Sequence, residues 1–239
     1  MTNEQHIVSS FDRDLETIQA QIMKMGGMVE RAISDAARSL ETRDEELAEE
    51  VRGRDKAIDA LEQQINEDAA QVLARRAPTA SDLRLVLTGI KISASLERIG
   101  DYAKNIAKRT SVLSGMAPVN GSPAALRRMA REVEEMLKDV LDAYIQRDAD
   151  LAHEVINRDQ DVDQMYNAIF REFLTFMMED PRNITPCMHL HFIAKNTERM
   201  GDLVTSVAEQ VIYLVTGEMP DEPRPKGDKT SIDPSIAPV

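Results

Sequence analysis

The strongest constraint on this sequence is that its second half repeats its first half. Three landmarks recur in the same order: an Arg-Asp pair at 43–44 and 147–148, a proline at 78 and 181, and a Glu-Arg-x-Gly-Asp stretch at 97–101 and 198–202. Order, spacing and break residues recur together, which chance similarity between two helices does not produce. The chain is therefore predicted to fold as two copies of one unit.

The composition favours helices in both copies. The 239 residues include no Trp, only 4% aromatic residues, 10 Gly and 10 Pro. Straight-chain residues and Ala lose little rotamer freedom in a helix, whereas sheets favour β-branched and aromatic residues. The chain is predicted to be all-α, and Asp44 and Asp148 are placed to cap helices. Apolar periodicity predicts six long helices, over 11–42, 44–76, 80–113, 124–147, 149–179 and 183–216.

The breaks predict two tandem three-helix bundles related by the repeat. The first bundle is expected over 10–113 and the second over 124–216, joined by a Pro- and Gly-containing linker at 114–123. From Gly217 onward the chain has five prolines and almost no apolar periodicity. Residues 217–239 are therefore predicted to form a disordered tail.

Charge and cysteine content exclude several classes of protein. The formal net charge is −13, which argues against a protein that binds duplex nucleic acid or anionic lipid. The apolar runs are too short to insert in a membrane, and the N-terminal residues lack the pattern of a signal peptide. The single cysteine, Cys187, excludes an internal disulfide framework and zinc sites built from several thiolates, and it fits a cytoplasmic location.

The repeated stretch places carboxylates where an apolar stripe should continue. In the first copy, Glu97 and Asp101 are four residues apart and share a helix face, as do Asp55 and Asp59 on the preceding helix, with Glu62 one turn further. Antiparallel packing of the two helices can bring these rows together. Carboxylate oxygens without cysteine suit hard cations. We therefore predict a metal site here.

The second copy offers a similar set of carboxylates: Asp159, Asp163, Glu198 and Asp202. Tyr166 stands where the first copy has Glu62, and Lys195 lies one turn before Glu198. Because a lysine repels a cation and competes for the carboxylate, the first copy is expected to hold metal more tightly. Each Gly within the repeated stretch costs about 1 kcal/mol in a helix. Two of them at matching positions predict a close helix approach.

Other functional classes have weaker support in the residues. The Glu-x-x-His pairs of di-iron bundles are missing, as are a phosphate-binding glycine loop and a recognisable nucleophile-base pair. No catalytic or organic-cofactor site is predicted, and the protein is not expected to be an enzyme. Two alternatives stay open: a carboxylate-bridged metalloenzyme and a helical scaffold without metal, in which the acidic pairs are solvated faces or ion pairs.

Two three-helix units that each carry Glu-Arg-[Ile/Met]-Gly-Asp in the third helix resemble the PhoU family. The stretches Leu96–Ala107 and Asp180–Ile184 are also similar to that family, and the likeness covers residues 10–216. Ser206 departs from it, because family members usually carry Asn there, as Asn105 does in the first copy.

The resemblance implies a function that the residues alone do not specify. Members of the family are cytoplasmic, often homodimeric proteins that restrain the phosphate-starvation response when phosphate is plentiful. The implied partners are the ATPase subunit of the phosphate ABC transporter and a phosphate-sensing histidine kinase. The resemblance also implies that metal ions (iron, manganese, zinc or magnesium) bind to the repeated carboxylates.

Overall fold

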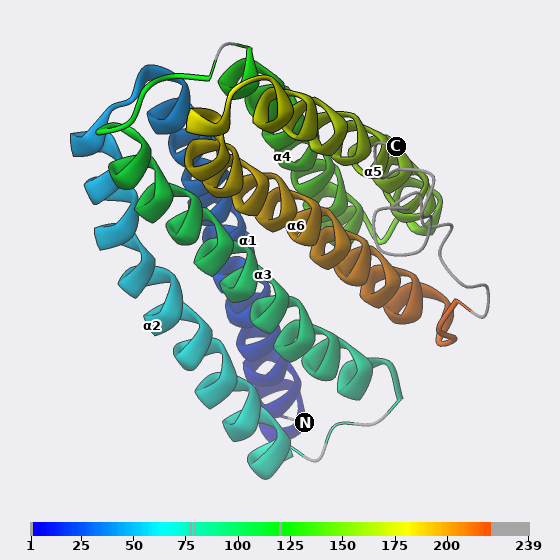
Figure 1. Cartoon of the computed structure of the whole chain (residues 1–239). Coiled ribbons are helices and arrows are strands. Elements are labelled where there is room, and N and C mark those ends of the chain that lie inside the picture. Colours follow the sequence, from blue (N-terminus) through cyan, green and yellow to red (C-terminus); the bar gives the residue numbers. More distant parts are fainter. Residues whose placement is uncertain (1, 77, 79, 120, 221–239) are drawn as a thin grey trace.

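A computed structural model of the chain consists of six long helices and one short 3-10 turn (Figure 1). It describes residues 2–76, 78, 80–119 and 121–220, with residues 2–11 and 76 described by their backbone alone. The elements are α1 (Thr2–Thr42), α2 (Glu45–Arg76), α3 (Ala80–Leu113), α4 (Ser122–Gln146), α5 (Ala149–Glu179), η1 (Pro181–Asn183) and α6 (Ile184–Thr216). No strand occurs in these ranges. The predicted all-α class is confirmed, and α1 begins nine residues before the periodicity indicated.

The turns between helices form as their residues predict. The side chain of Asp44 accepts a hydrogen bond from the backbone N–H of Leu47 at 2.9 Å, and Asp148 accepts from the N–H groups of Asp150 and Leu151, both at 3.0 Å. These contacts satisfy N–H groups that lack a partner in the first turn of a helix. The predicted capping role of both aspartates is confirmed.

The two copies pack against each other through equivalent helices. Near one end of the molecule Arg109 of α3 lies 4.4 Å from the Phe192 ring of α6, and near the other Arg84 of α3 meets Gly217 after α6. These contacts make α3 and α6 antiparallel. α1 and α4 are also antiparallel, because Glu41 pairs with Arg127 and Gly26 lies against Leu141. Buried apolar residues from all six helices form one continuous core. The division at 114–123 stays a prediction from the sequence, because the packing joins both copies.

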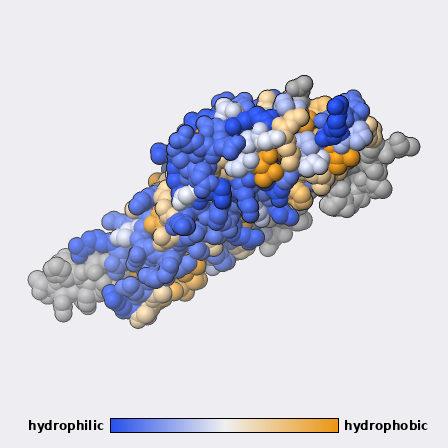
Figure 2. Space-filling model, turned by 60° about the vertical axis from the view of Figure 1, so that its left-hand side comes forward, coloured by the Kyte–Doolittle hydropathy of each residue, from blue (hydrophilic) through white to orange (hydrophobic). Residues whose placement is uncertain are grey.

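The surface fits an acidic, largely hydrophilic protein. Figure 2 shows one face of the molecule, on which hydrophobic residues form small separate patches among hydrophilic ones. Over the ranges described, no helix combines the length and apolarity needed to span a bilayer. Most of the predicted tail, residues 221–239, lies outside the described residues. Gly217, the first residue of the predicted tail, ends α6 with a φ of 85°, a conformation that glycine adopts without strain.

Candidate functional site

The helices bring the first set of predicted carboxylates into one cluster. This first cluster consists of Asp55, Asp59 and Glu62 on α2 with Glu97 and Asp101 on α3. Burial and the negative charges of the other four raise the pKa of Glu97 above its ordinary value. Burial and Asp55 likewise raise the pKa of Asp59. The carboxylates are therefore close enough to repel one another, as the sequence predicts.

A lysine that the sequence analysis did not single out balances part of this charge. The Nζ atom of Lys104 lies 2.5 Å from Oδ2 of Asp55 and donates a hydrogen bond to Oδ1 of Asp101 at 3.2 Å. The hydrogen bond to Asp55 raises the pKa of Lys104. Lys104 is three residues after Asp101, a spacing at which helical side chains meet, so the signal was present in the sequence.

Asp55 is the most buried member of the first cluster. The residue is only 3% exposed, and within the described part of the chain its Oδ1 atom is buried without a hydrogen-bond partner. Leaving a buried acceptor unsatisfied costs about 1–3 kcal/mol. This oxygen is therefore available to an additional ligand in a way that an exposed carboxylate is not.

The second set of predicted carboxylates is more deeply buried than the first. This second cluster consists of Asp159 and Asp163 on α5 with Glu198 and Asp202 on α6. Asp159, Asp163 and Glu198 are each 5% exposed or less. Lys195 lies 2.8 Å from Oε1 of Glu198 and 4.8 Å from the centroid of the Tyr166 ring. The direct contact between Lys195 and Glu198 that the sequence suggests is present.

The lysines change the comparison between the clusters. From the sequence, tighter metal binding is expected in the first cluster for two reasons: Tyr166 replaces the counterpart of Glu62 in the second cluster, and Lys195 lies one turn before Glu198. In the structure each cluster contains a lysine. Lys104 of the first cluster follows the repeated Glu-Arg-x-Gly-Asp stretch in the sequence, and Lys195 of the second cluster precedes it. Charge from a lysine therefore gives no reason to prefer the first cluster.

The repeated glycines allow the close helix approach that their positions predict. A Cβ atom on Gly100 would lie 3.1 Å from Cδ1 of Ile58, and one on Gly201 would lie 2.7 Å from Oδ1 of Asp159. A side chain at Gly201 would therefore displace the Asp159 carboxylate, and one at Gly100 would require Ile58 to shift slightly. The glycines thus set the distance between the carboxylate rows.

The donor chemistry of the clusters suits a metal, although the side chains are not gathered around one point. Carboxylate oxygens are the ligands that hard cations prefer, and Oδ1 of Asp55 is an acceptor still without a partner. Across the described residues, however, no three His, Cys, Asp or Glu side chains are arranged to hold a metal ion. Metal binding at the first cluster would require Lys104 to release Asp55 and Asp101.

Comparisons with known proteins agree with the repeat. The chain matches the PhoU domain twice, over residues 22–110 and 126–211. A phosphate-specific transport system accessory protein PhoU homolog of Rhizobium meliloti (strain 1021) is 45% identical over 230 residues, covering 95% of each chain. A protein of the same description from Zymomonas mobilis is 46% identical over 222 residues, covering 92% of this chain and 93% of the other.

Solved structures give the same result for the fold. The crystal structure of PhoU from Pseudomonas aeruginosa superposes with a TM-score of 0.83 at 40% identity, covering 87% of this chain and all of that one. The phosphate transport system regulatory protein PhoU from Streptococcus pneumoniae gives a TM-score of 0.81 at 29% identity, covering 89% of this chain and all of its own. With two domain matches, relatives of nearly equal length and the same helical architecture, this chain belongs to the PhoU family.

Proposed function

We propose that this protein regulates phosphate uptake from the cytoplasm and restrains the phosphate-starvation response when phosphate is plentiful. The observation that carries the proposal is the likeness over almost the whole chain to accessory proteins of phosphate-specific transport. In this role the protein acts by binding other proteins and not as an enzyme. Its partners are the ATPase subunit of the phosphate ABC transporter and a phosphate-sensing histidine kinase, and it works as a homodimer.

Deletion of the gene tests the regulatory role. A strain without the protein should express phosphate-starvation genes, such as a secreted phosphatase, in phosphate-rich medium. Expression should return to the repressed level when the full chain is supplied from a plasmid. Normal repression in the deletion strain, where no second copy of the gene exists, would remove the proposed function.

Association with purified partners tests the adaptor role separately. Tagged protein should retain the ATPase subunit of the transporter and the cytoplasmic part of the kinase, but not an unrelated transporter ATPase subunit. Retention of neither partner would leave a phosphate-linked role without an adaptor mechanism. Size-exclusion chromatography with light scattering measures the molar mass of the protein in the same preparation. The mass of a monomer at all concentrations would contradict the proposed homodimer.

We further propose that both carboxylate clusters bind metal ions, with iron, manganese, zinc or magnesium as the candidates. Support comes from the mutual repulsion of the first-cluster carboxylates and from the unsatisfied Oδ1 of Asp55. A bound cation would neutralise these charges, while Lys104 and Lys195 supply the countercharge without it. In the first cluster Asp55, Asp59, Glu62, Glu97 and Asp101 would hold the ion; in the second, Asp159, Asp163, Glu198 and Asp202 would do so.

Elemental analysis of protein purified without chelator tests the metal proposal. The double variants Glu97→Ala/Asp101→Ala and Glu198→Ala/Asp202→Ala should each lose part of the bound metal. The control Glu154→Ala/Asp161→Ala removes two exposed carboxylates outside the clusters and should lose none. Metal-free wild-type protein with normal phosphate control would favour the helical scaffold. Turnover of a substrate by the metal-loaded protein would favour the metalloenzyme.

A further inference from the structure

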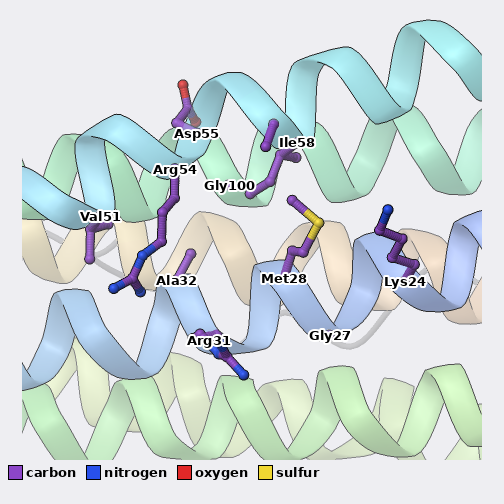
Figure 3. A pocket seen from close by; sticks show the side chains of 11 residues that line it. Lys24, Gly27, Met28, Arg31, Ala32, Val51, Arg54, Asp55, Ile58 and Gly100 are labelled. Atoms are coloured by element: carbon purple, nitrogen blue, oxygen red, sulfur yellow. The ribbon is translucent and has the colours of Figure 1, made fainter.

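A groove between α1 and α2 lies next to the first cluster but presents the opposite charge. It has a volume of about 380 Å³ and is shown in Figure 3. Its apolar lining includes Met28 of α1 with Val51 and Ile58 of α2. In Figure 3, Lys24 and Met28 extend from α1 toward α2, and Arg54 extends from α2 toward α1. A Cβ atom on Gly27 would meet nothing within 4 Å, so the groove is open at that point.

The charged residues of this groove are mostly cations. Lys24, Arg31 and Arg54 line it. Among the described residues that line it, Asp55 is the one acidic residue, and it is held by Lys104 of α3. Among the residues that the structure describes, Lys24 and Arg31 form no ion pair. Arg54 pairs with Asp35, 2.7 Å away, and with Glu50. On a chain with a net charge of −13, a cationic groove with an apolar lining is an exception that favours an anionic occupant.

The second copy of the repeat indicates what kind of anion fits. Arg54 pairs with Asp35 on the preceding helix, and Arg158 pairs with Asp139 at the same sequence separation. In the same register, Met28 and Arg31 of α1 correspond to Glu132 and Glu135 of α4. The second copy thus carries two additional carboxylates where the first has an apolar and a cationic side chain.

These additional carboxylates bind the second-copy arginine. Arg158 lies 2.7 Å from Oε1 of Glu132 and 3.7 Å from Oε2 of Glu135. In the second copy the arginine is therefore saturated by three acidic residues of its own chain. In the first copy Arg54 lacks the counterparts of Glu132 and Glu135, and the cation Arg31 stands in the place of one of them.

We infer that the α1–α2 groove binds an acidic amphipathic segment of a partner protein, with carboxylates toward the cations that line it, Lys24, Arg31 and Arg54, and an apolar side chain against Met28 and Ile58. The inference rests on the proposed adaptor function, because it supplies a surface for one of the partners. The incoming carboxylate takes the role that Glu132 and Glu135 perform in the second copy.

Both parts of the ligand are needed for useful affinity. Exposed ion pairs are weakened by water and salt, so carboxylates alone bind weakly. Burial of a leucine-sized side chain against the apolar lining supplies the larger share of the affinity. Lys24, Met28 and Arg31 lie along two turns of α1, a spacing that matches side chains repeated every three or four residues on an approaching helix.

The groove also adjoins the first cluster. Asp55 and Gly100 line the groove, while Asp55 belongs to the cluster and Gly100 to the repeated stretch. A segment bound in the groove therefore contacts the same turn of α2 that holds Lys104.

A binding assay with a defined probe tests this inference. The probe is a fluorescein-labelled helical peptide in which leucine and glutamate alternate at three- and four-residue spacing, and its matched partner has glutamine for every glutamate. Fluorescence anisotropy with the full chain should show salt-sensitive binding of the acidic peptide, about tenfold tighter than the glutamine peptide, which corresponds to ~1.4 kcal/mol. Equal binding of the two peptides, or none by the acidic one, would overturn the inference.

The decisive variant copies the second repeat into the first. Met28→Glu/Arg31→Glu supplies, beside the Asp35 and Glu50 that Arg54 already contacts, the two carboxylates that the second copy has, and it should weaken acidic-peptide binding about tenfold or more. The control Arg171→Glu/Gln164→Glu changes the net charge equally at exposed positions of α5 and should bind as the wild type does. Equal weakening by the control would mean general charge repulsion, and unchanged binding by the first variant would place the peptide elsewhere; either result refutes the groove.

A second variant protects the test against misfolding. Lys24→Gln/Arg31→Gln removes two exposed cations without placing charge in the apolar lining, and it should lose most of the salt-sensitive binding. Complementation of the deletion strain then separates the two proposals. If wild-type protein restores repression and Met28→Glu/Arg31→Glu restores it equally, the regulatory function stands and the groove does not serve it.

Discussion

Replacement of Gly201 by alanine should destabilise the protein, although alanine is the better helix former. In a helix interior the exchange gains about 1 kcal/mol from propensity. Here the added Cβ would lie 2.7 Å from Oδ1 of Asp159, a residue that is 4% exposed and has little room to move. Overpacking of a filled interior costs about 1–3 kcal/mol and displaces a buried carboxylate in addition. We expect a net loss of about 1–2 kcal/mol.

Two other glycines of the same chain provide matched controls for Gly201→Ala. At Gly53 of α2 a Cβ would meet nothing within 4 Å, so Gly53→Ala should gain about 1 kcal/mol. At Gly100 the new Cβ would lie 3.1 Å from a terminal methyl group of Ile58, a milder overlap than the 2.7 Å approach at Gly201. Gly100→Ala should therefore fall between the other two variants.

Urea unfolding followed by circular dichroism, in chelator and at one pH, measures the three variants without a contribution from metal. The expected order of unfolding free energy is Gly53→Ala, then Gly100→Ala, then Gly201→Ala. A loss of ~1 kcal/mol lowers Tm by about 2–4 °C in a chain of this size. If Gly201→Ala equals or exceeds Gly100→Ala in stability, the claim that this glycine sets the helix spacing is wrong.

Three further predictions each concern one side chain. Arg43→Ala should lower the free energy of unfolding by about 1.5–3 kcal/mol, because Nη2 of Arg43 donates to the carbonyls of Leu113, Ser114 and Met116 at the end of α3. Urea unfolding measures this loss, and Arg43→Lys should recover only part of the lost stability. Asp148→Ala should cost about 1 kcal/mol through loss of the α5 cap, with Asp148→Asn as the retaining control. Glu97→Gln should stabilise metal-free protein at pH 7. Burial and the neighbouring carboxylates raise the pKa of Glu97 above its ordinary value. Its ionisation therefore destabilises the folded state at pH values above the raised pKa, and the advantage of the variant should vanish as the pH falls below the ordinary pKa of a glutamate. An advantage that persists at low pH would contradict the electrostatic cause.

The helices and their order could be predicted because local signals specify them. Asp44 and Asp148 cap helices through contacts within three residues, and prolines mark the same breaks in both copies. The glycines of the repeated stretch could be interpreted for a similar reason, since a recurrent cost to helix stability requires a compensating packing contact. These features depend on near neighbours or on exact repetition.

The details of the two clusters could not be predicted in the same way. The contact of Lys104 with Asp55 joins two helices, and its distance depends on how α2 and α3 are rotated about their axes. Likewise, the hydrogen bonds from Arg43 to carbonyls some 70 residues away follow from the tertiary fold and have no local signature. Repetition alone also suggests that the two copies are equivalent. Met28 and Glu132 stand at matching positions, however, and only Glu132 carries a charge.

The antiparallel pairing of α3 with α6 and of α1 with α4 has a consequence for how the two halves can diverge. Each pair joins a helix to its own repeat, which is the arrangement found at the two-fold axis of a symmetric homodimer. In such a homodimer every substitution appears twice, once on each side of the axis. Here the connection through residues 114–121 places both halves in one gene, so a substitution changes one half alone. Position 28 can then carry a methionine while its counterpart at 132 carries a glutamate, and one half becomes free to bind a ligand that the other half does not need.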